Sequence, residues 1–270
     1  MVEPIYINSN ELAKLKVIGE GTDGKIYKLD NKTLLKIYHH SNEYFPQKNK
    51  QIYDNEGVNI TPYKNNDFIN TDSALRYYDT DGVKLSREMA IIRAIERQEN
   101  VKKTKLPKNL IYVDGKLKGC VIDYHRFCTN IYKALNLPYA MRLKIARNIL
   151  EKVKELLDAN IYHIDLAQCP TVDCKNTNVL LTKSLKPEII DIDGKSAIYT
   201  ESFSKNYYRQ SLYSLNVLII ELLSRLNLHE NLEDLNVFDL SDINHNFPLY
   251  MLEDFKEDKL TLSKMTSYLK

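Results

Sequence analysis

Apolar and polar residues alternate over the first forty residues in the manner of β-strands. Three short runs, at 15–18, 25–29 and 33–38, are rich in Leu, Ile, Val and Tyr. A cluster of glycines separates the first run from the second, and polar residues 30–32 separate the second from the third. Runs of this kind bounded by turn residues predict three antiparallel strands with a glycine turn between the first two.

Apolar residues at helical spacing dominate the later part of the chain. They predict helices at 84–100, around 143–157 and around 212–226. The third helix is apolar on nearly every side, so we expect it to be buried. Between the first two helices, residues 110–113 and 119–122 flank an Asp-Gly turn and predict a strand hairpin.

Strands that come first and helices that come later predict an α+β protein with two lobes. Two further short strands are predicted at 179–181 and 188–192. Residues 39–82 are rich in Asn, Asp, Lys and Tyr and indicate a polar insertion. We therefore expect a β-rich N-terminal domain at 1–124 that contains the insertion, and a helical domain at 125–270.

The composition excludes several classes of protein. The 270 residues include 38 Lys and Arg against 36 Asp and Glu, so a net charge of +2 argues against a nucleic-acid partner. No apolar stretch approaches the roughly 20 residues of a membrane span, and no signal peptide is evident. Four cysteines are too few for a disulfide scaffold. These features predict a cytoplasmic protein without a membrane partner.

The first candidate for chemistry is the glycine loop Gly19, Gly21 and Gly24. Glycine lets backbone N–H groups approach phosphate oxygens without a Cβ in the way. A strand follows this loop, whereas a dinucleotide-binding site needs a helix there. A glycine loop between two strands resembles the loop that protein kinases fold over the phosphates of ATP.

The resemblance to protein kinases assigns a role to Lys36, which lies in the next apolar strand. In that family a lysine here contacts the α- and β-phosphates and pairs with a glutamate on the following helix. Glu88 is the expected partner because it lies three and four residues before Ile91 and Ile92 and shares their face. Glu96 is the competing choice.

The catalytic loop of the family, H-R-D-L, resembles His163-Ile164-Asp165-Leu166. The aspartate would accept the proton of the acceptor hydroxyl. The family also expects an Asn five residues later, where this chain has Pro170. Two alignments therefore compete, and we favour the first.

In the favoured alignment Asp165 is the catalytic carboxylate, and extra residues precede the metal-binding Asn178. In the other alignment Asp173 is catalytic, with Lys175 between it and Asn178 at the family's position. A third reading is a degenerate kinase in which neither aspartate is well placed.

The magnesium-binding D-F-G motif resembles Asp191-Ile192-Asp193, with Gly194 next. Asp191 would bind Mg²⁺ together with Asn178. Asp193 stands where the family has glycine, and it could assist at the metal.

The resemblance also implies an adenine pocket. Its roof would be Ile18 and Ile26, and its floor Leu180. The residues from Asp123 to His125 would form the hinge whose backbone pairs with adenine.

Together these motifs predict a bilobal protein-kinase-like fold with a helical, abbreviated C-lobe. The implied function is Mg-ATP-dependent transfer of phosphate to a protein Ser, Thr or Tyr hydroxyl. The arginine of H-R-D is Ile164 here, A-P-E is absent, and Ser211 replaces the aspartate at the start of the buried helix. These departures leave two alternatives: a small-molecule alcohol kinase of the aminoglycoside or choline kinase type, and an inactive or nucleotide-binding pseudokinase that acts as a binding module.

Overall fold

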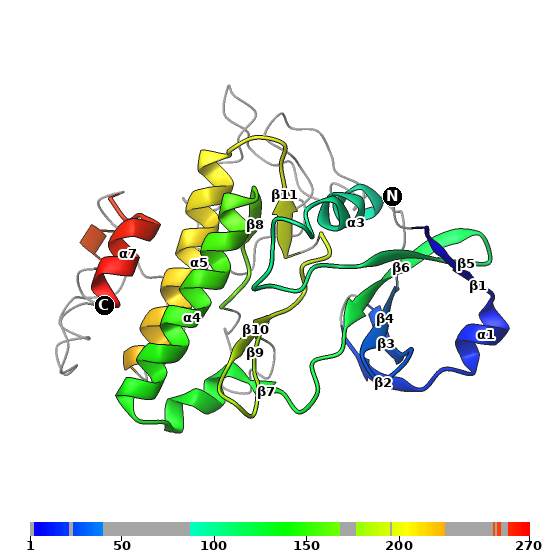
Figure 1. Cartoon of the computed structure of the whole chain (residues 1–270), viewed down its shortest axis with the longest axis horizontal. Coiled ribbons are helices and arrows are strands. Elements are labelled where there is room, and N and C mark those ends of the chain that lie inside the picture. The colour runs from blue at the N-terminus through cyan, green and yellow to red at the C-terminus, as the bar shows by residue number, and fades with distance from the viewer. Residues whose placement is uncertain are drawn as a thin grey trace.

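The computed structural model describes residues 3–21, 24–39, 87–167, 177–194, 196–224, 251, 253–254 and 259–270. A sheet of short strands occupies one end of the chain's fold, and long helices occupy the other (Figure 1). This order confirms the predicted α+β class. Nearly all of the predicted polar insertion, from residue 40 onward, lies outside the described residues.

The first sheet has six strands in the order β1-β5-β6-β4-β3-β2. Only β1 and β5 run parallel; the other neighbours are antiparallel. The strands are β1 (Ile5–Ile7), β2 (Val17–Glu20), β3 (Gly24–Lys28), β4 (Thr33–Tyr38), β5 (Asn109–Val113) and β6 (Lys116–Asp123), and the short helix α1 (Ser9–Ala13) follows β1.

The predicted hairpins are confirmed. β2, β3 and β4 are consecutive antiparallel neighbours, as the alternating pattern indicated. β5 and β6 meet at Asp114 and Gly115, whose φ angles are 50° and 75°. Positive φ at both central residues is the geometry that favours Asp-Gly in two-residue hairpins.

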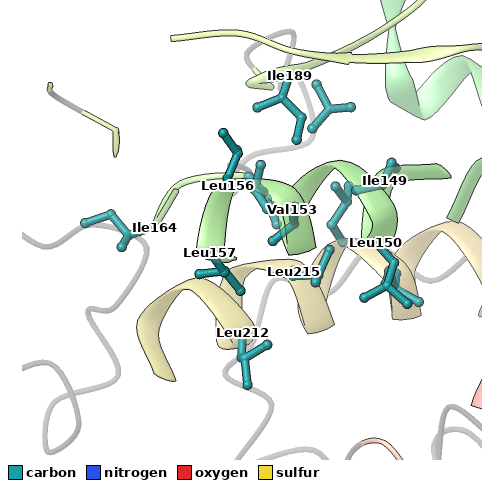
Figure 2. Packing of buried hydrophobic residues seen from close by; sticks show 14 of the residues in the cluster. Ile149, Leu150, Val153, Leu156, Leu157, Ile164, Ile189, Leu212 and Leu215 are labelled. Carbon is teal, nitrogen blue, oxygen red and sulfur yellow. The ribbon is translucent and has the colours of Figure 1, made fainter. Parts of the chain in front are cut away.

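The helical part is built on the long helices α4 (Tyr139–Asp158) and α5 (Lys205–Ser224), which lie side by side (Figure 1). Figure 2 shows Ile149, Val153 and Leu157 of α4 in the same apolar cluster as Leu212 and Leu215 of α5. The predicted spacing is confirmed for both helices. α5 begins seven residues before Leu212 because its first turns carry polar residues that the apolar pattern could not include.

Short elements complete the described fold. Helix α3 (Arg87–Glu96) packs against the sheet at β5. Two small sheets have the strand orders β10-β9-β7 and β11-β8. The elements concerned are β7 (Thr129–Asn130), the 3₁₀ helix η2 (Ile131–Asn136), β8 (Ile161–His163), β9 (Val179–Leu181), β10 (Pro187–Ile189), β11 (Ala197–Tyr199) and α7 (Leu262–Tyr268).

The pair β8 and β11 positions two of the predicted motifs. Ala197 lies opposite His163, and Tyr199 lies opposite Ile161. The chain just after β8 and the chain just before β11 are therefore neighbours. Asp165 and Asp191 belong to these two stretches, so the ladder brings them close together.

Arg93 of α3 and Arg97, which directly follows α3, bind the end of β11 and the residues just after it. Arg93 donates to the carbonyl oxygen of Tyr199 at 2.8 Å and pairs with Glu201 at 3.0 Å. Arg97 donates to the carbonyl oxygen of Thr200 at 2.6 Å. These bonds fix the helix to the strand. Of the helices that the structure describes, none has the length and hydropathy needed to cross a membrane.

Candidate functional site

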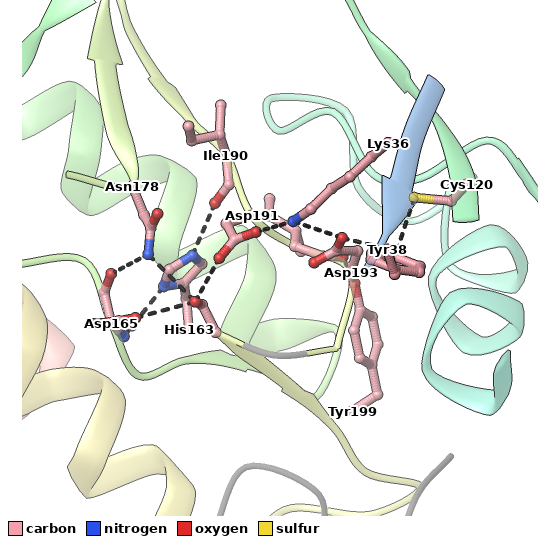
Figure 3. A network of polar contacts seen from close by, with 12 residues as sticks. Lys36, Tyr38, Cys120, His163, Asp165, Asn178, Ile190, Asp191, Asp193 and Tyr199 are labelled. Atoms are coloured by element: carbon pink, nitrogen blue, oxygen red, sulfur yellow. Dashed lines mark hydrogen bonds and ion pairs between the residues drawn. The ribbon is translucent and has the colours of Figure 1, made fainter. Parts of the chain in front are cut away.

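A buried polar cluster lies where the sheet meets the loops of the helical part (Figure 3). Lys36 reaches it from β4, and Asp191 and Asp193 reach it from the turn between β10 and β11. The remaining members come from the segments around β8, β9 and β11: His163, Asp165, Asn178 and Ser196. We call these seven residues the polar cluster.

The ammonium of Lys36 binds two carboxylates. It forms an ion pair with Asp191, and a second with Asp193 Oδ2 at 2.8 Å. Lys36 is only 8% exposed. Burial by itself would lower the pKa of Lys36, but the two carboxylates outweigh burial and hold the pKa above its usual value. Lys36 is therefore a fully charged ammonium in the interior.

Asp191 adopts a backbone φ of 62°, which is uncommon for a residue with a side chain. Burial would raise the pKa of Asp191, but the charge of Lys36 and hydrogen bonds from Lys36 and Ser196 hold the pKa well below its usual range. The carboxylate is thus ionised. The left-handed backbone conformation of Asp191 is therefore one that the surrounding structure imposes.

Ser196 connects the two aspartates of the predicted motifs. Its hydroxyl oxygen lies 2.8 Å from Asp191 Oδ2 and 3.1 Å from Asp165 Oδ2. Because a hydroxyl carries one hydrogen, it donates to one of these carboxylates at a time. Asp165 is 2% exposed, whereas the side chain of Asp191 is 19% exposed, so Asp165 is the more deeply buried of the two.

His163 fixes the backbone of both motifs. Its Nδ1 accepts the backbone N–H of Asp165 at 3.3 Å, so Nε2 carries the proton that is donated to the carbonyl oxygen of Ile190 at 3.0 Å. The imidazole therefore holds the residue before Asp191 at a set distance from Asp165.

Asn178 completes the cluster. Its Nδ2 donates to the backbone oxygen of Asp165 at 2.8 Å and lies 3.3 Å from Ser196 Oγ. Both contacts use the nitrogen, which leaves the amide oxygen available to a cation. Carboxylate and amide oxygens are the hard ligands that Mg²⁺ prefers, so Asp191 and Asn178 fit this ion chemically.

Mg²⁺ at phosphate-transfer sites usually takes one or two carboxylates from the protein and other oxygens from the substrate. Within the described residues, no group of three or more His, Cys, Asp or Glu side chains forms a metal site by itself.

The structure does not bring Glu88 and Lys36 together. Glu88 Oε1 accepts a hydrogen bond from the hydroxyl of Tyr112 at 2.6 Å, and no ion pair joins Glu88 to Lys36, both of which are described. Tyr112 lies in β5, and β6 separates that strand from β4. Two strand spacings amount to about 10 Å. Glu88 therefore serves a different strand from the one that carries Lys36.

The glycine loop closes as a hairpin turn. The N–H of Gly21 donates to the carbonyl oxygen of Gly24 at 2.9 Å, and residues 22–23 lie outside the described residues. Among the described residues, a Cβ on Gly21 would meet nothing within 4 Å, whereas one on Gly24 would overlap the carbonyl oxygen of Ile37. Gly24 is therefore required by packing on β4. A Cβ on Gly19 would make only an ordinary contact with Ile26.

The residues predicted for an adenine pocket have varied surroundings. Ile18 is 38% exposed and sits at a bulge in β2, and Ile26 lies opposite Lys36 in the ladder. Leu180 is half-buried in β9, opposite Asn130.

The predicted hinge is already partly bonded within the protein. Asp123 pairs with Lys108, and the N–H of Tyr124 donates to the carbonyl oxygen of Lys32 at 2.8 Å. Burial lowers the pKa of His125. Of the three hinge residues, Tyr124 is thus bonded through its N–H to the turn between β3 and β4.

Three residues of the site belong to no motif that the sequence displays. Ser196 carries no motif, and Tyr38, two residues after Lys36, donates its hydroxyl hydrogen to Asp193 Oδ2 at 2.8 Å. Ser214 of α5 accepts the N–H of Leu166 at 2.6 Å and so anchors the loop after β8. The period-2 spacing of Lys36 and Tyr38 was the only available signal, since it places both on one face of β4.

Two predicted residues, Asp173 and Lys175, lie outside the described residues. No protein-family model matches the chain, and a search of curated proteins likewise finds no match. Function must therefore be inferred from the residues and their geometry.

Proposed function

We propose that the chain is an Mg-ATP-dependent phosphotransferase with a bilobal protein-kinase-like fold that phosphorylates a protein Ser, Thr or Tyr hydroxyl. The observation that carries the proposal is the ion pair between Lys36 of the sheet and Asp191 of the helical part, 155 residues apart. Asp165 and Asn178 lie beside that pair in one polar cluster. All four residue types stand in the order that the kinase motifs require.

In this proposal each residue of the cluster has its own task. Lys36 binds phosphate oxygens of the nucleotide, and the glycine loop covers them with backbone N–H groups. Asp191 and Asn178 hold Mg²⁺, which when bound neutralises charge on the phosphates. Asp165 orients the acceptor hydroxyl and takes its proton.

The carboxylate of Asp165 is held for this task by its neighbours. Ser196 can donate to Asp165 or to Asp191, so when it turns from Asp191 its hydroxyl hydrogen is available to Asp165. His163 fixes its backbone N–H, and Asn178 fixes its carbonyl oxygen. Such preorganisation is what a general base requires. In this reading residues 1–124 and 125–270 are the two lobes.

A small-molecule alcohol is the second candidate acceptor, and a specific feature favours it. Only residues 200–204 connect β11 to α5. The N–H of Ser204 donates to the hydroxyl of Tyr162 at 2.9 Å, which fixes the end of that connection. So short a link offers little chain for docking a peptide.

The test is incubation with labelled ATP and Mg²⁺, in the presence of protein substrates and of a panel of small alcohols. Lys36→Met and Asp191→Asn should each abolish transfer. The matched controls Lys116→Met and Asp158→Asn change exposed residues and should retain it. Transfer that persists in both cluster variants would reject the assigned roles. Nucleotide binding without transfer to any acceptor would instead indicate a pseudokinase.

A further inference from the structure

We propose that Asp193 is the carboxylate that positions Lys36 toward the phosphates of the nucleotide, in place of a glutamate on helix α3. This inference rests on the proposed function, because it names a further residue of the same site. Asp193 is a positioning residue: it acts through Lys36.

Asp193 is placed to hold an ammonium. Its side chain is 2% exposed, and Oδ2 lies 2.8 Å from Lys36 Nζ and accepts the hydroxyl of Tyr38 at 2.8 Å. Its other oxygen, Oδ1, is buried and has no hydrogen-bond partner among the described residues. A buried carboxylate needs a cation, and Lys36 is the cation that meets it.

The turn that carries Asp193 is fixed on both sides. The hydroxyl of Tyr199 donates to the carbonyl oxygen of Ile192 at 2.5 Å. Gly194 has a φ of +97°, and a Cβ there would lie 2.5 Å from the Cβ of Ala90 on α3. Only glycine lets the turn approach the helix so closely. Helix α3 therefore supports Asp193 by packing, while its own Glu88 binds Tyr112.

Asp191 cannot serve as the lasting partner of Lys36 if it also binds the metal. When Asp191 is engaged with Mg²⁺, its oxygens are shared between the two cations. Asp193 then remains as the second carboxylate in contact with the ammonium. The two carboxylates around Lys36 thus have separate tasks: Asp191 binds the metal, and Asp193 holds the lysine.

The experiment compares two ligands by isothermal titration calorimetry on the full chain: a non-hydrolysable ATP analogue with Mg²⁺, and adenosine. Lys36 acts on phosphates, so only the first ligand reports its position. Asp193→Asn should weaken the ATP analogue about 10-fold or more and leave adenosine unchanged, because a charge-assisted contact is lost. A merely structural role would weaken both ligands equally.

Three further variants make the comparison decisive. We call the affinity for the ATP analogue divided by the affinity for adenosine the affinity ratio. Tyr38→Phe removes only the hydroxyl whose hydrogen bond Asp193 accepts, and it should lower the affinity ratio by a few fold. It also decides the question if Asp193→Asn fails to fold: an unchanged ratio would then overturn the proposal. Glu88→Gln tests the competing partner, and Asp158→Asn is an exposed control.

The outcomes separate this inference from the proposed function. Wild-type protein that binds the ATP analogue, with the same ratio in Asp193→Asn, overturns the inference alone. A lower affinity ratio in Glu88→Gln but not in Asp193→Asn also overturns the inference, and it would make Glu88 of α3 the residue that positions Lys36. Wild-type protein that binds neither ligand rejects the proposed function, and the role of Asp193 falls with it.

Discussion

Tyr112 donates its hydroxyl hydrogen to Glu88 at 2.6 Å, and this bond joins strand β5 to helix α3. The hydrogen bond to Glu88, together with burial and the nearby charge, raises the pKa of Tyr112 to about 12. An unfolded tyrosine ionises near pH 10, so between about pH 10 and 12 the folded state keeps a proton that the unfolded state has lost. The free energy of unfolding should therefore fall as the pH rises through this interval.

Tyr112→Phe should remove that part of the pH dependence. Urea unfolding measured at pH 9, 10 and 11 checks it. Tyr6→Phe is the matched control because Tyr6 stacks on the Tyr112 ring and is 68% exposed. An identical slope in wild type and Tyr112→Phe would contradict the assignment.

Gly24→Ala should destabilise the sheet, whereas Gly21→Ala should not. The added methyl at Gly24 overlaps the carbonyl oxygen of Ile37, and overpacking of this kind costs about 1–3 kcal/mol. A methyl added at Gly21 would meet no atom of the described residues within 4 Å, so the expected change is below about 0.5 kcal/mol. Thermal unfolding of both variants measures the difference, and equal melting temperatures would show that β3 and β4 are less closely packed.

Ser214→Ala should cost about 1–3 kcal/mol of unfolding free energy. The hydroxyl of Ser214 accepts the backbone N–H of Leu166 at 2.6 Å and that of Ala167 at 3.3 Å, and its removal leaves these groups buried without the acceptor. Ser211 lies on the same helix, fully buried, and its Oγ has no hydrogen-bond partner in the described part of the chain. Ser211→Ala is therefore expected to be neutral or slightly stabilising. Denaturant titration compares the pair, and a larger loss in Ser211→Ala would invert the prediction.

Lys36→Met should be strongly destabilising at neutral pH, by about 3–5 kcal/mol, because Asp191 and Asp193 stay buried without their cation. In the wild-type protein the pKa of Asp191 is lowered, so its contribution to stability is present above the usual pKa of aspartate and is lost as the pH falls below it. Without Lys36, burial raises that pKa. Acidification from pH 7 to 5 should then reduce the difference in free energy of unfolding between the variant and the wild type, as measured by denaturant unfolding.

A difference in free energy of unfolding between Lys36→Met and wild type that stays constant with pH would contradict the assignment of Lys36 as the cation of the two aspartates. Lys116→Met is the control for the loss of a strand lysine, because Lys116 is exposed at the start of β6. It should change the free energy of unfolding by less than about 0.5 kcal/mol at either pH.

Local signals made much of the fold predictable. The hairpins and the two long helices depend on turn residues and on periods within about twenty residues, which the sequence displays directly. The three-residue strands β8 and β11 are too short to show an alternation, and only the ladder between them reveals their role. Helix α7 was not predicted either, because its seven residues follow a stretch whose apolar residues show no clear period.

The site was predictable as a set of residues but not as a set of contacts. Lys36 and Asp191 were assigned from motifs, and the structure brings them together. Which carboxylate holds the other side of the ammonium depends on how α3 is rotated about its axis and on the turn around Gly194. Both are tertiary features, so Glu88 was expected where Asp193 lies.

Arg93 of α3 and Arg97, just after that helix, bind the end of β11, and β11 pairs with β8, so the helix and the two strands are connected. A rotation of helix α3 would therefore displace the stretches next to these two strands, which carry Asp165 and Asp191. The backbone around the two aspartates is therefore tied to helix α3 through the guanidinium groups of Arg93 and Arg97, far along the chain from either aspartate.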